Sequence, residues 1–160
     1  MKLTTRHFGE IEVDEAKIIL FEEGIPGFEK LKRFALFHNE GEAADNDAEQ
    51  ESAFMWLQCI DDGDIAFVLI NVYMFVPGYA PRFDTTELER LGVCGDDELI
   101  IRNIAVVPER MEDISVNLKA PVIINARTQK GRQSVVQNDE YHIRHHIFRE
   151  IKEALNDTAV

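Results

Sequence analysis

One stretch of the sequence decides the fold class: Ile114-Ser-Val-Asn-Leu-Lys-Ala-Pro-Val-Ile-Ile-Asn-Ala-Arg127, followed after a short turn by Arg132-Gln-Ser-Val-Val-Gln137. Every even position from 114 to 126 is apolar, and most odd positions are polar. This period of two places one face of an extended ribbon in a core and the other in water. Pro121 lacks a backbone N–H, so it should split the run into two strands. Gln129-Lys130-Gly131 then predicts a hairpin loop in which the glycine supplies a positive φ.

Further strand patterns run along most of the chain and alternate with turn residues. The predicted strands are residues 2–8, 10–13, 18–21, 34–38, 54–60, 66–72, 99–107, 115–118, 122–127 and 132–136. Many short strands with frequent turns favour a barrel or sandwich, and closing a barrel removes exposed edges. The sequence therefore predicts an all-β fold, a compact antiparallel β-barrel-like single domain. Bulky strand residues argue for a filled interior over a ligand-binding barrel: Phe67, Leu69, Phe75, Ile100 and Ile104.

Helix is predicted at two places. Thr86-Glu-Leu-Glu89 has the spacing of a capping box, and Gly92 is a stop signal, so a short helix is predicted near residues 86–91. From His145 to Leu155, apolar residues recur at spacings of three and four, which predicts an amphipathic C-terminal helix of about ten residues. That helix either packs on the barrel or offers a face to another chain.

The composition of the 160-residue chain is that of one folded domain. Apolar residues make up 45% and include ten Phe, which excludes a disordered chain. The sequence shows neither a secretion leader nor an apolar run of about 20 residues, so no membrane span is expected. Two cysteines, Cys59 and Cys94, cannot form a disulfide framework and are interpreted as buried or partly buried free thiols. A cytoplasmic protein is therefore predicted.

The charge is strongly negative and unevenly distributed. The formal net charge is −13, from 30 acidic residues against 17 Lys and Arg, and no Lys or Arg lies between Arg33 and Arg82. Such a surface repels phosphates, which argues against direct nucleic-acid binding, and it favours encounter with a basic protein. Solubility alone is the alternative explanation. Residues 40–51 carry six acids and no β-branched or aromatic side chain, so they are predicted to form a mobile loop.

Sequence motifs for catalysis are lacking. The chain has no phosphate-cradling Gly-rich loop, no GxGxxG after a strand, no His-Glu-x-x-His pair and no Gly-x-Ser-x-Gly elbow. His142, His145 and His146 stand beside two acids, and imidazole and carboxylate groups bind transition metals. A metal-dependent enzyme or metal-binding protein built on these histidines is therefore the alternative hypothesis. The competing interpretation is a solvated joint in which Tyr141 and Ile143 are the buried anchors.

Several segments together resemble one known family. They are residues 1–13 (MKLTTRHFGEIEV), 21–28 (FEEGIPGF), 54–68 with its FMWLQ and AFV runs, and the run from 114 to 144 that ends in Tyr-His-Ile-Arg. In order and spacing they resemble the flagellar assembly factor FliW family over nearly the whole chain. The chain departs from the family pattern at the acidic insertion 40–51 and after about residue 147. Proline is often seen in the family where His142 and His146 stand, which weakens a family-wide metal role.

The resemblance implies a non-enzymatic protein without a cofactor or bound metal. A FliW-like β-barrel domain would span residues 1–147, and residues 148–160 would form a helical extension. Members of the family bind two proteins in turn. One is CsrA, a basic dimeric RNA-binding protein that represses translation of flagellin mRNA, and the other is flagellin, bound in the cytoplasm before export. Free FliW-like protein would bind CsrA and relieve repression, and accumulating flagellin would capture it and restore repression.

An acidic face suits such a role physically. A negative surface beside a basic RNA-binding dimer weakens the phosphate contacts of that dimer, and couplings between separate sites are typically about 1–3 kcal/mol. We therefore predict a partner-binding acidic face that includes Glu22, Glu23, Asp61, Asp62 and Asp64. The sequence offers no signature motif for either interface.

Overall fold

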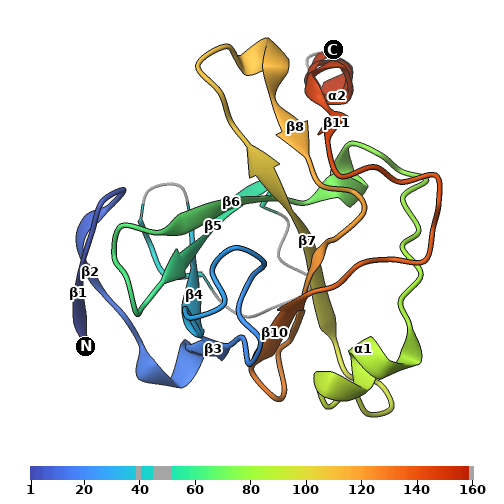
Figure 1. The fold of residues 1–160 in the computed structure, drawn as a ribbon. Coiled ribbons are helices and arrows are strands. Elements are labelled where there is room, and N and C mark those ends of the chain that lie inside the picture. The colour runs from blue at the N-terminus through green and yellow to red at the C-terminus, as the bar shows by residue number, and fades with distance from the viewer. Residues whose placement is uncertain (39–40, 45–51, 159–160) are drawn as a thin grey trace.

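The architecture is mainly β (Figure 1). The computed structural model describes residues 1–38, 41–44 and 52–158. The strands in these ranges are β1 (Lys2–Thr5), β2 (Gly9–Glu12), β3 (Ile19–Leu20), β4 (Arg33–Phe37), β5 (Phe54–Cys59), β6 (Ala66–Ile70), β7 (Leu99–Val106), β8 (Ser115–Val116), β9 (Val122–Asn125), β10 (Lys130–Gln133) and β11 (His145–His146). The helices are α1 (Thr85–Arg90) and α2 (Phe148–Thr158), with 3₁₀ turns at η1 (Glu15–Lys17), η2 (Val72–Met74) and η3 (Met111–Asp113).

Seven of these strands close into a barrel. Neighbours are hydrogen-bonded in the order β7-β6-β5-β4-β3-β10-β9, and β9 returns to β7. The pairings are antiparallel except between β3 and β10, where Leu20 lies beside Lys130 in parallel register. The predicted all-β, barrel-like fold is confirmed, and the parallel contact at β3 is the point where the ring is completed.

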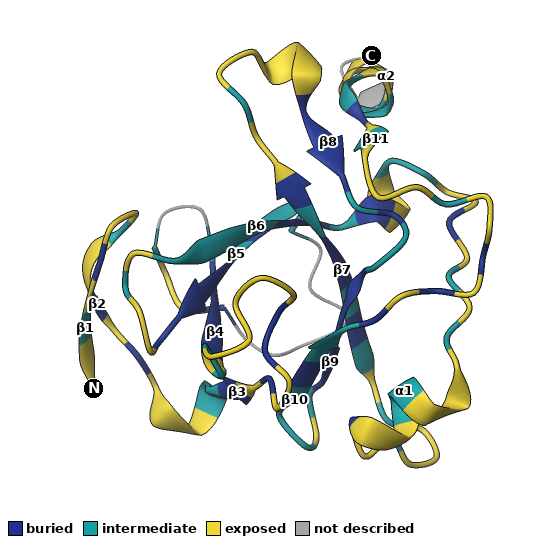
Figure 2. Cartoon of the chain, viewed as in Figure 1, coloured by how far each residue is buried: buried dark blue, intermediate teal, exposed yellow. Residues whose placement is uncertain are grey.

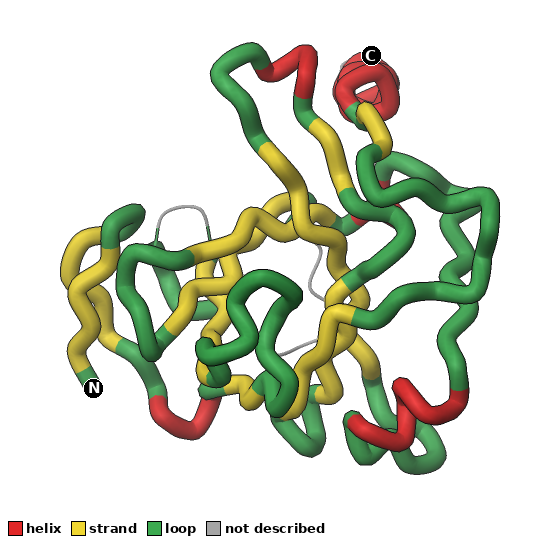
Figure 3. The backbone as a smooth tube through the Cα atoms, viewed as in Figure 1, coloured by secondary structure: helices red, strands yellow, loops and turns green. Residues whose placement is uncertain are grey.

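Strand β7 belongs both to the barrel and to a projecting arm (Figure 3). Its first half, Leu99 to Arg102, pairs with β9. Its second half pairs with β8, which pairs in turn with β11. Pro121 lies between β8 and β9, so the predicted break of the run into two strands is confirmed. The helices α1 and α2 lie at the periphery (Figure 3).

The barrel strands carry many buried residues (Figure 2), and their apolar side chains form a core inside the barrel, as predicted, although Phe75 packs on a second core. Phe21 and Phe34 are fully buried in the barrel core, with ring centroids 5.0 Å apart in an edge-to-face arrangement. A second core under the arm includes Val116 and Ile147, and α2 covers it. A third core joins β4 and β5 to the separate two-stranded sheet of β1 and β2. Burying such side chains stabilises a fold by roughly 25 cal/mol per Å² of apolar surface.

Much of the predicted acidic loop 40–51 lies outside the described residues. The described part, residues 41–44, packs beside β4 instead of extending into solvent. Ala44 donates its backbone N–H to Leu36 and is 2% exposed, and Phe37 forms a bridge with Ala43. The prediction that this segment buries too little to order itself does not hold at Ala44, because its small side chain fits where a strand edge offers a hydrogen bond.

The hairpin between β9 and β10 uses its glycine differently from the prediction. The residue with positive φ is Gln129, at 56°, and not Gly131. Gly131 instead lies within β10, where a Cβ atom would stand 2.5 Å from Cε1 of Phe21. Glycine is thus required by close approach to the buried ring rather than by backbone conformation.

The predicted short helix near residues 86–91 is confirmed as α1, and three other local predictions need correction. Helix α1 begins at Thr85 because Asp84 is its N-cap and accepts a hydrogen bond from the backbone N–H of Thr86. His145 belongs to β11 instead of starting the C-terminal helix. Ile143, predicted as a buried anchor, is 71% exposed, and Cys94 is an exposed thiol. In each case the tertiary neighbours, which local spacing does not encode, set the outcome.

Candidate partner-binding surface

The turn between β5 and β6 holds three of the five predicted acids. Asp61 is an anchor of this turn: its carboxylate accepts backbone N–H groups of Lys32 and Arg33 at 3.0 Å and pairs with Nε of Arg33 at 2.7 Å. Although partial burial opposes it, these contacts hold the pKa of Asp61 below its usual range. The charge of Asp61 is therefore largely compensated within the molecule.

Asp62 and Asp64 project from the same turn as exposed carboxylates. Within the described ranges neither of them makes a salt bridge. The backbone that carries them is fixed, since Nε2 of the buried Gln58 lies 3.2 Å from the carbonyl of Gly63, which also accepts the backbone N–H of Arg6 at 3.0 Å. A Cβ atom on Gly63 would stand 2.1 Å from a carbonyl oxygen of β1. The backbone of the turn is thus held in place, and it presents the carboxylates of Asp62 and Asp64 to solvent.

The other two predicted acids lie on the loop after β3 and are paired. Glu22 contacts Lys130 at 3.0 Å, and Glu23 contacts both Arg90 and Arg132. The hydrogen bond from Arg132 is the main reason that the pKa of Glu23 is lowered. The predicted acidic face therefore has one half on this loop, where both carboxylates are paired, and one half at the turn, where Asp61 is paired but Asp62 and Asp64 make no salt bridge in the described structure.

Lys32 connects the two halves. Its backbone N–H binds Asp61, and its Nζ donates to the carbonyl of Glu22 at 3.0 Å. The loop from Phe21 to Lys32 is held at its ends, because Phe21 donates its N–H to the carbonyl of Lys32. Through Lys32, the loop that carries Glu22 and Glu23 is joined to Asp61 at the turn.

Two of the grooves among the described residues bear on partner binding, one beside this surface and one on the arm, and the sequence did not indicate either of them. The first, of about 300 Å³, lies between the loop after β3, α1 and the segment after β10. The second, of about 350 Å³, is almost wholly apolar and lies between η3, β5 and α2. The first is lined by Glu23, Gly24, Pro26, Glu29, Glu87, Arg132, Gln133 and Val135. The second is lined by Phe54, Met111, Phe148, Ile151, Lys152, Leu155 and Asn156.

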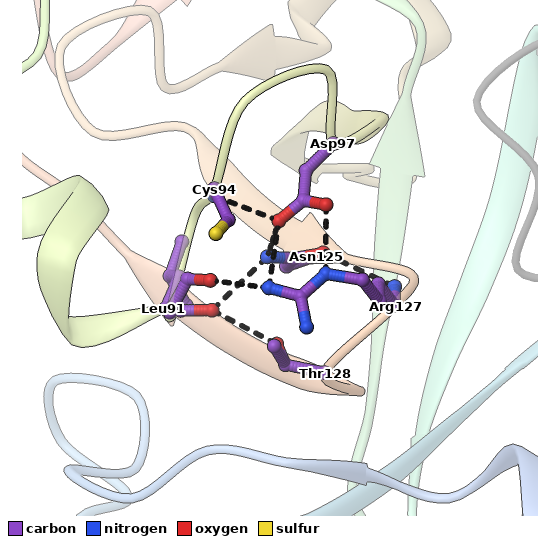
Figure 4. A network of polar contacts seen from close by, with 7 residues as sticks. Leu91, Cys94, Asp97, Asn125, Arg127 and Thr128 are labelled. Carbon is purple, nitrogen blue, oxygen red and sulfur yellow. Dashed lines mark hydrogen bonds and ion pairs between the residues drawn. The ribbon is translucent and has the colours of Figure 1, made fainter.

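A polar network ties the loop after α1 to the hairpin between β9 and β10 (Figure 4). Arg127 pairs with Asp97 at 2.7 Å and donates to the carbonyl of Gly92, while Asn125 donates to Asp97 and to the carbonyl of Leu91. The hydrogen bond from Arg127 is the largest cause that lowers the pKa of Asp97 to about 2. These contacts hold the loop after α1 against the hairpin.

The histidines do not form a metal centre among the described residues. No group of three or more His, Cys, Asp or Glu side chains in the described ranges gathers closely enough to hold an ion. His145 faces α2, where its Nε2 lies 2.9 Å from Glu150, and its neighbour His146 on β11 is exposed. Adjacent strand residues point to opposite faces, which separates these two rings. The alternative hypothesis of a metal site at His142, His145 and His146 therefore finds no support in the geometry.

Comparison with known proteins places the barrel in a family. A sequence model of the FliW protein matches residues 2–147. The chain belongs to the FliW family. It is 41% identical to the flagellar assembly factor FliW of Thermoanaerobacter pseudethanolicus over 98% of this chain and 99% of the relative, and 43% identical to that of Caldanaerobacter subterraneus subsp. tengcongensis over 96% and 97%. The crystal structure of a flagellar assembly factor FliW superimposes with a TM-score of 0.80 at 31% identity, covering 92% of this chain and 96% of that one.

The FliW-family match ends at residue 147, and α2 begins at Phe148. This helix packs on the second core through Phe148 and Ile151, whereas Leu155 is 63% exposed beside the apolar groove. Packing of the helix on the fold is therefore confirmed for these residues, and its display to another chain stays a prediction. None of the described helices is long and apolar enough to cross a membrane.

Proposed function

We propose that this FliW-family protein is a non-catalytic, cytoplasmic partner switch. It binds a CsrA-type translational regulator, antagonises repression of flagellin mRNA by that regulator, and is itself captured by flagellin. Membership of a family of flagellar assembly factors supports the biological setting. The observation that carries the mechanism is the rigid turn that presents Asp62 and Asp64 without a compensating cation in the described structure.

The physical argument concerns charge in the bound state. A basic RNA-binding dimer attracts RNA through phosphate contacts that depend steeply on salt. Fixed carboxylates brought close to that dimer lower its local positive potential, so RNA affinity falls even when the RNA site stays open. Because the turn is already ordered, binding pays little conformational entropy for presenting the charges. A coupling of about 1–3 kcal/mol, or roughly 5- to 150-fold in RNA affinity, is enough to switch repression.

The first experiment tests the switch itself. A labelled flagellin mRNA leader is bound to the purified regulator, and the FliW-family protein is then added, followed by flagellin. We expect the RNA to be released at the first addition and to bind again at the second. Failure of the first addition to release RNA would remove the regulator from the proposal, and failure of the second would remove flagellin.

The second experiment tests the acidic turn. Reversing Asp62 and Asp64 to Lys should weaken binding of the regulator about tenfold at low salt, with a smaller effect at high salt, because exposed charges contribute roughly 0.2–1 kcal/mol each and reversal adds repulsion. The matched control reverses Glu109 and Asp139, which are exposed and likewise make no salt bridge in the described structure. Equal losses of affinity in the two double variants would mean that only total charge matters and that the turn is not a contact.

A further inference from the structure

The groove beside β10 combines a negative wall with a fixed apolar surface. It lies where the loop after β3 faces α1 and the segment that follows β10. Three carboxylates line it, from Glu23, Glu29 and Glu87, against the single guanidinium of Arg132. The groove therefore carries more negative than positive charge, although the neighbouring strand β10 carries Lys130 and Arg132.

Arg132 compensates only two of the three carboxylates. It contacts both Glu23 and Glu87, and these partners raise its pKa although burial opposes the change. Glu29 makes no salt bridge in the described structure. Its carboxylate accepts the backbone N–H of Gly27 at 3.0 Å, which is the main reason that its pKa is lowered. Glu29 is therefore ionised at neutral pH and has acceptor capacity left for a partner's cation.

Val135 supplies the apolar part of the groove. It is 61% exposed, whereas Ser134 and Val136 on either side of it are buried. Ser134 donates its backbone N–H to Pro121, and Val136 donates to Lys119. Because both neighbours are pinned and side chains alternate along an extended segment, Val135 is held outward. An exposed apolar side chain on a fixed backbone contributes contact area without an ordering cost.

The loop wall opposite is equally fixed. Gly24 has φ +68°, and a Cβ atom there would stand 2.6 Å from Cα of Glu29, so the loop closes tightly on itself. Pro26 lies in this loop and lines the groove beside the carboxylates. The groove thus presents preformed aliphatic contacts next to the carboxylate of Glu29, which makes no salt bridge in the described structure.

We infer that this groove seats an extended basic segment of the CsrA-type regulator, with a Lys or Arg on Glu29 and aliphatic groups against Val135 and Pro26. The inference rests on the proposed function, which supplies a basic partner, and charge complementarity selects that partner over an acidic one. The groove alone is smaller than the roughly 800 Å² per partner of a standard interface. The loop from Phe21 to Lys32 continues from this groove to Asp61, so the groove and the acidic turn are linked by one stretch of backbone.

Matched substitutions test the groove. Val135→Asp should weaken binding of the purified regulator about tenfold or more, and Glu29→Gln about threefold to tenfold with a shallower salt dependence. Val106→Asp and Glu109→Gln are the controls, since Val106 is also 61% exposed and Glu109 is an exposed acid, both on the arm. We expect the controls to stay within about twofold of the unsubstituted protein, a change below what a central contact gives. Calorimetric titration with the regulator, and separately with flagellin, measures all four variants.

The outcomes separate this inference from the proposed function. If the unsubstituted protein binds the regulator and both groove variants bind it equally well, the groove assignment is overturned while the proposed function stands. If the unsubstituted protein does not bind the regulator, the proposed function fails and the inference with it. Loss of flagellin binding with intact regulator binding would show that the wrong occupant is assigned. Glu29→Gln, which removes one exposed charge, keeps the test decisive if Val135→Asp unfolds.

Discussion

Replacing Gly131 by alanine probes the closure of the barrel. Gly131 lies opposite Ile124 in the register of β9 and β10. A Cβ atom would stand 2.5 and 2.6 Å from two ring carbons of Phe21 and 3.1 Å from Cγ2 of Ile19. Phe21 is fully buried and packed edge-to-face on Phe34, so its ring has no free space into which to move. The substitution therefore forces a shift of the core at the strand pair that completes the ring.

The expected destabilisation is about 1–2 kcal/mol. Overpacking of a core typically costs about 1–3 kcal/mol, and the reduced entropy of the unfolded chain returns about 0.4–1 kcal/mol of this. For a chain of this length the melting temperature should fall by roughly 2–8 °C. Urea unfolding followed by the fluorescence of Trp56, the single tryptophan, measures the change. Gly78→Ala is the control, since no atom lies within 4 Å of its Cβ position and its φ is not positive. A Gly131→Ala variant within about 0.5 kcal/mol of that control would refute the steric argument, because surface substitutions are usually of that size.

Two further predictions concern titration and thiol reactivity. Asp97→Asn should lower the free energy of unfolding at neutral pH. Because the pKa of Asp97 is lowered to about 2, its carboxylate stabilises the fold above about pH 4, and this stabilisation is lost as the pH falls through 2. Urea unfolding of both proteins at a series of pH values should therefore give free energies that converge at low pH. An aromatic disulfide reagent should label the exposed Cys94 at once, whereas Cys59, which is buried with a raised thiol pKa, should react only as fast as the protein opens; prompt labelling of two thiols in the folded protein would contradict the described core.

The strand pattern of the sequence predicted the elements better than their pairing. Alternation from residue 114 to 126 predicted the ribbon, and Pro121 correctly predicted where it divides. Periodicity does not identify partners, however. The ring closes through one contact of Leu20 with Lys130, and two residues so far apart in the chain share no local signal. The same limit applies to Gly131, whose need for glycine comes from a ring on another strand.

At the candidate surface, too, the sequence located the acidic residues but not their ion-pair partners. Counting acids located the turn and the loop, but it assigned the same role to every carboxylate. The structure distinguishes Glu23, which pairs with cations from α1 and β10, from Asp62, which has no salt bridge in the described ranges. Ion pairing depends on which distant side chains meet, and the sequence does not give this. A local signal for Val135 did exist, since strict alternation sets Ser134 and Val136 on one face and leaves Val135 on the other.

The separation of compensated from uncompensated charge bears on how binding would proceed under the proposal. The net charge of −13 attracts a basic partner before contact is made, but salt screens this attraction over about 8–10 Å. Lifetime in the complex depends instead on groups that touch, chiefly the apolar surface at Val135 and the carboxylates of Glu29, Asp62 and Asp64. Added salt should therefore slow association more than it speeds dissociation, whereas Val135→Asp should speed dissociation at any salt. If the acidic residues served solubility alone, added salt would not slow association in this way, and Val135→Asp would not speed dissociation.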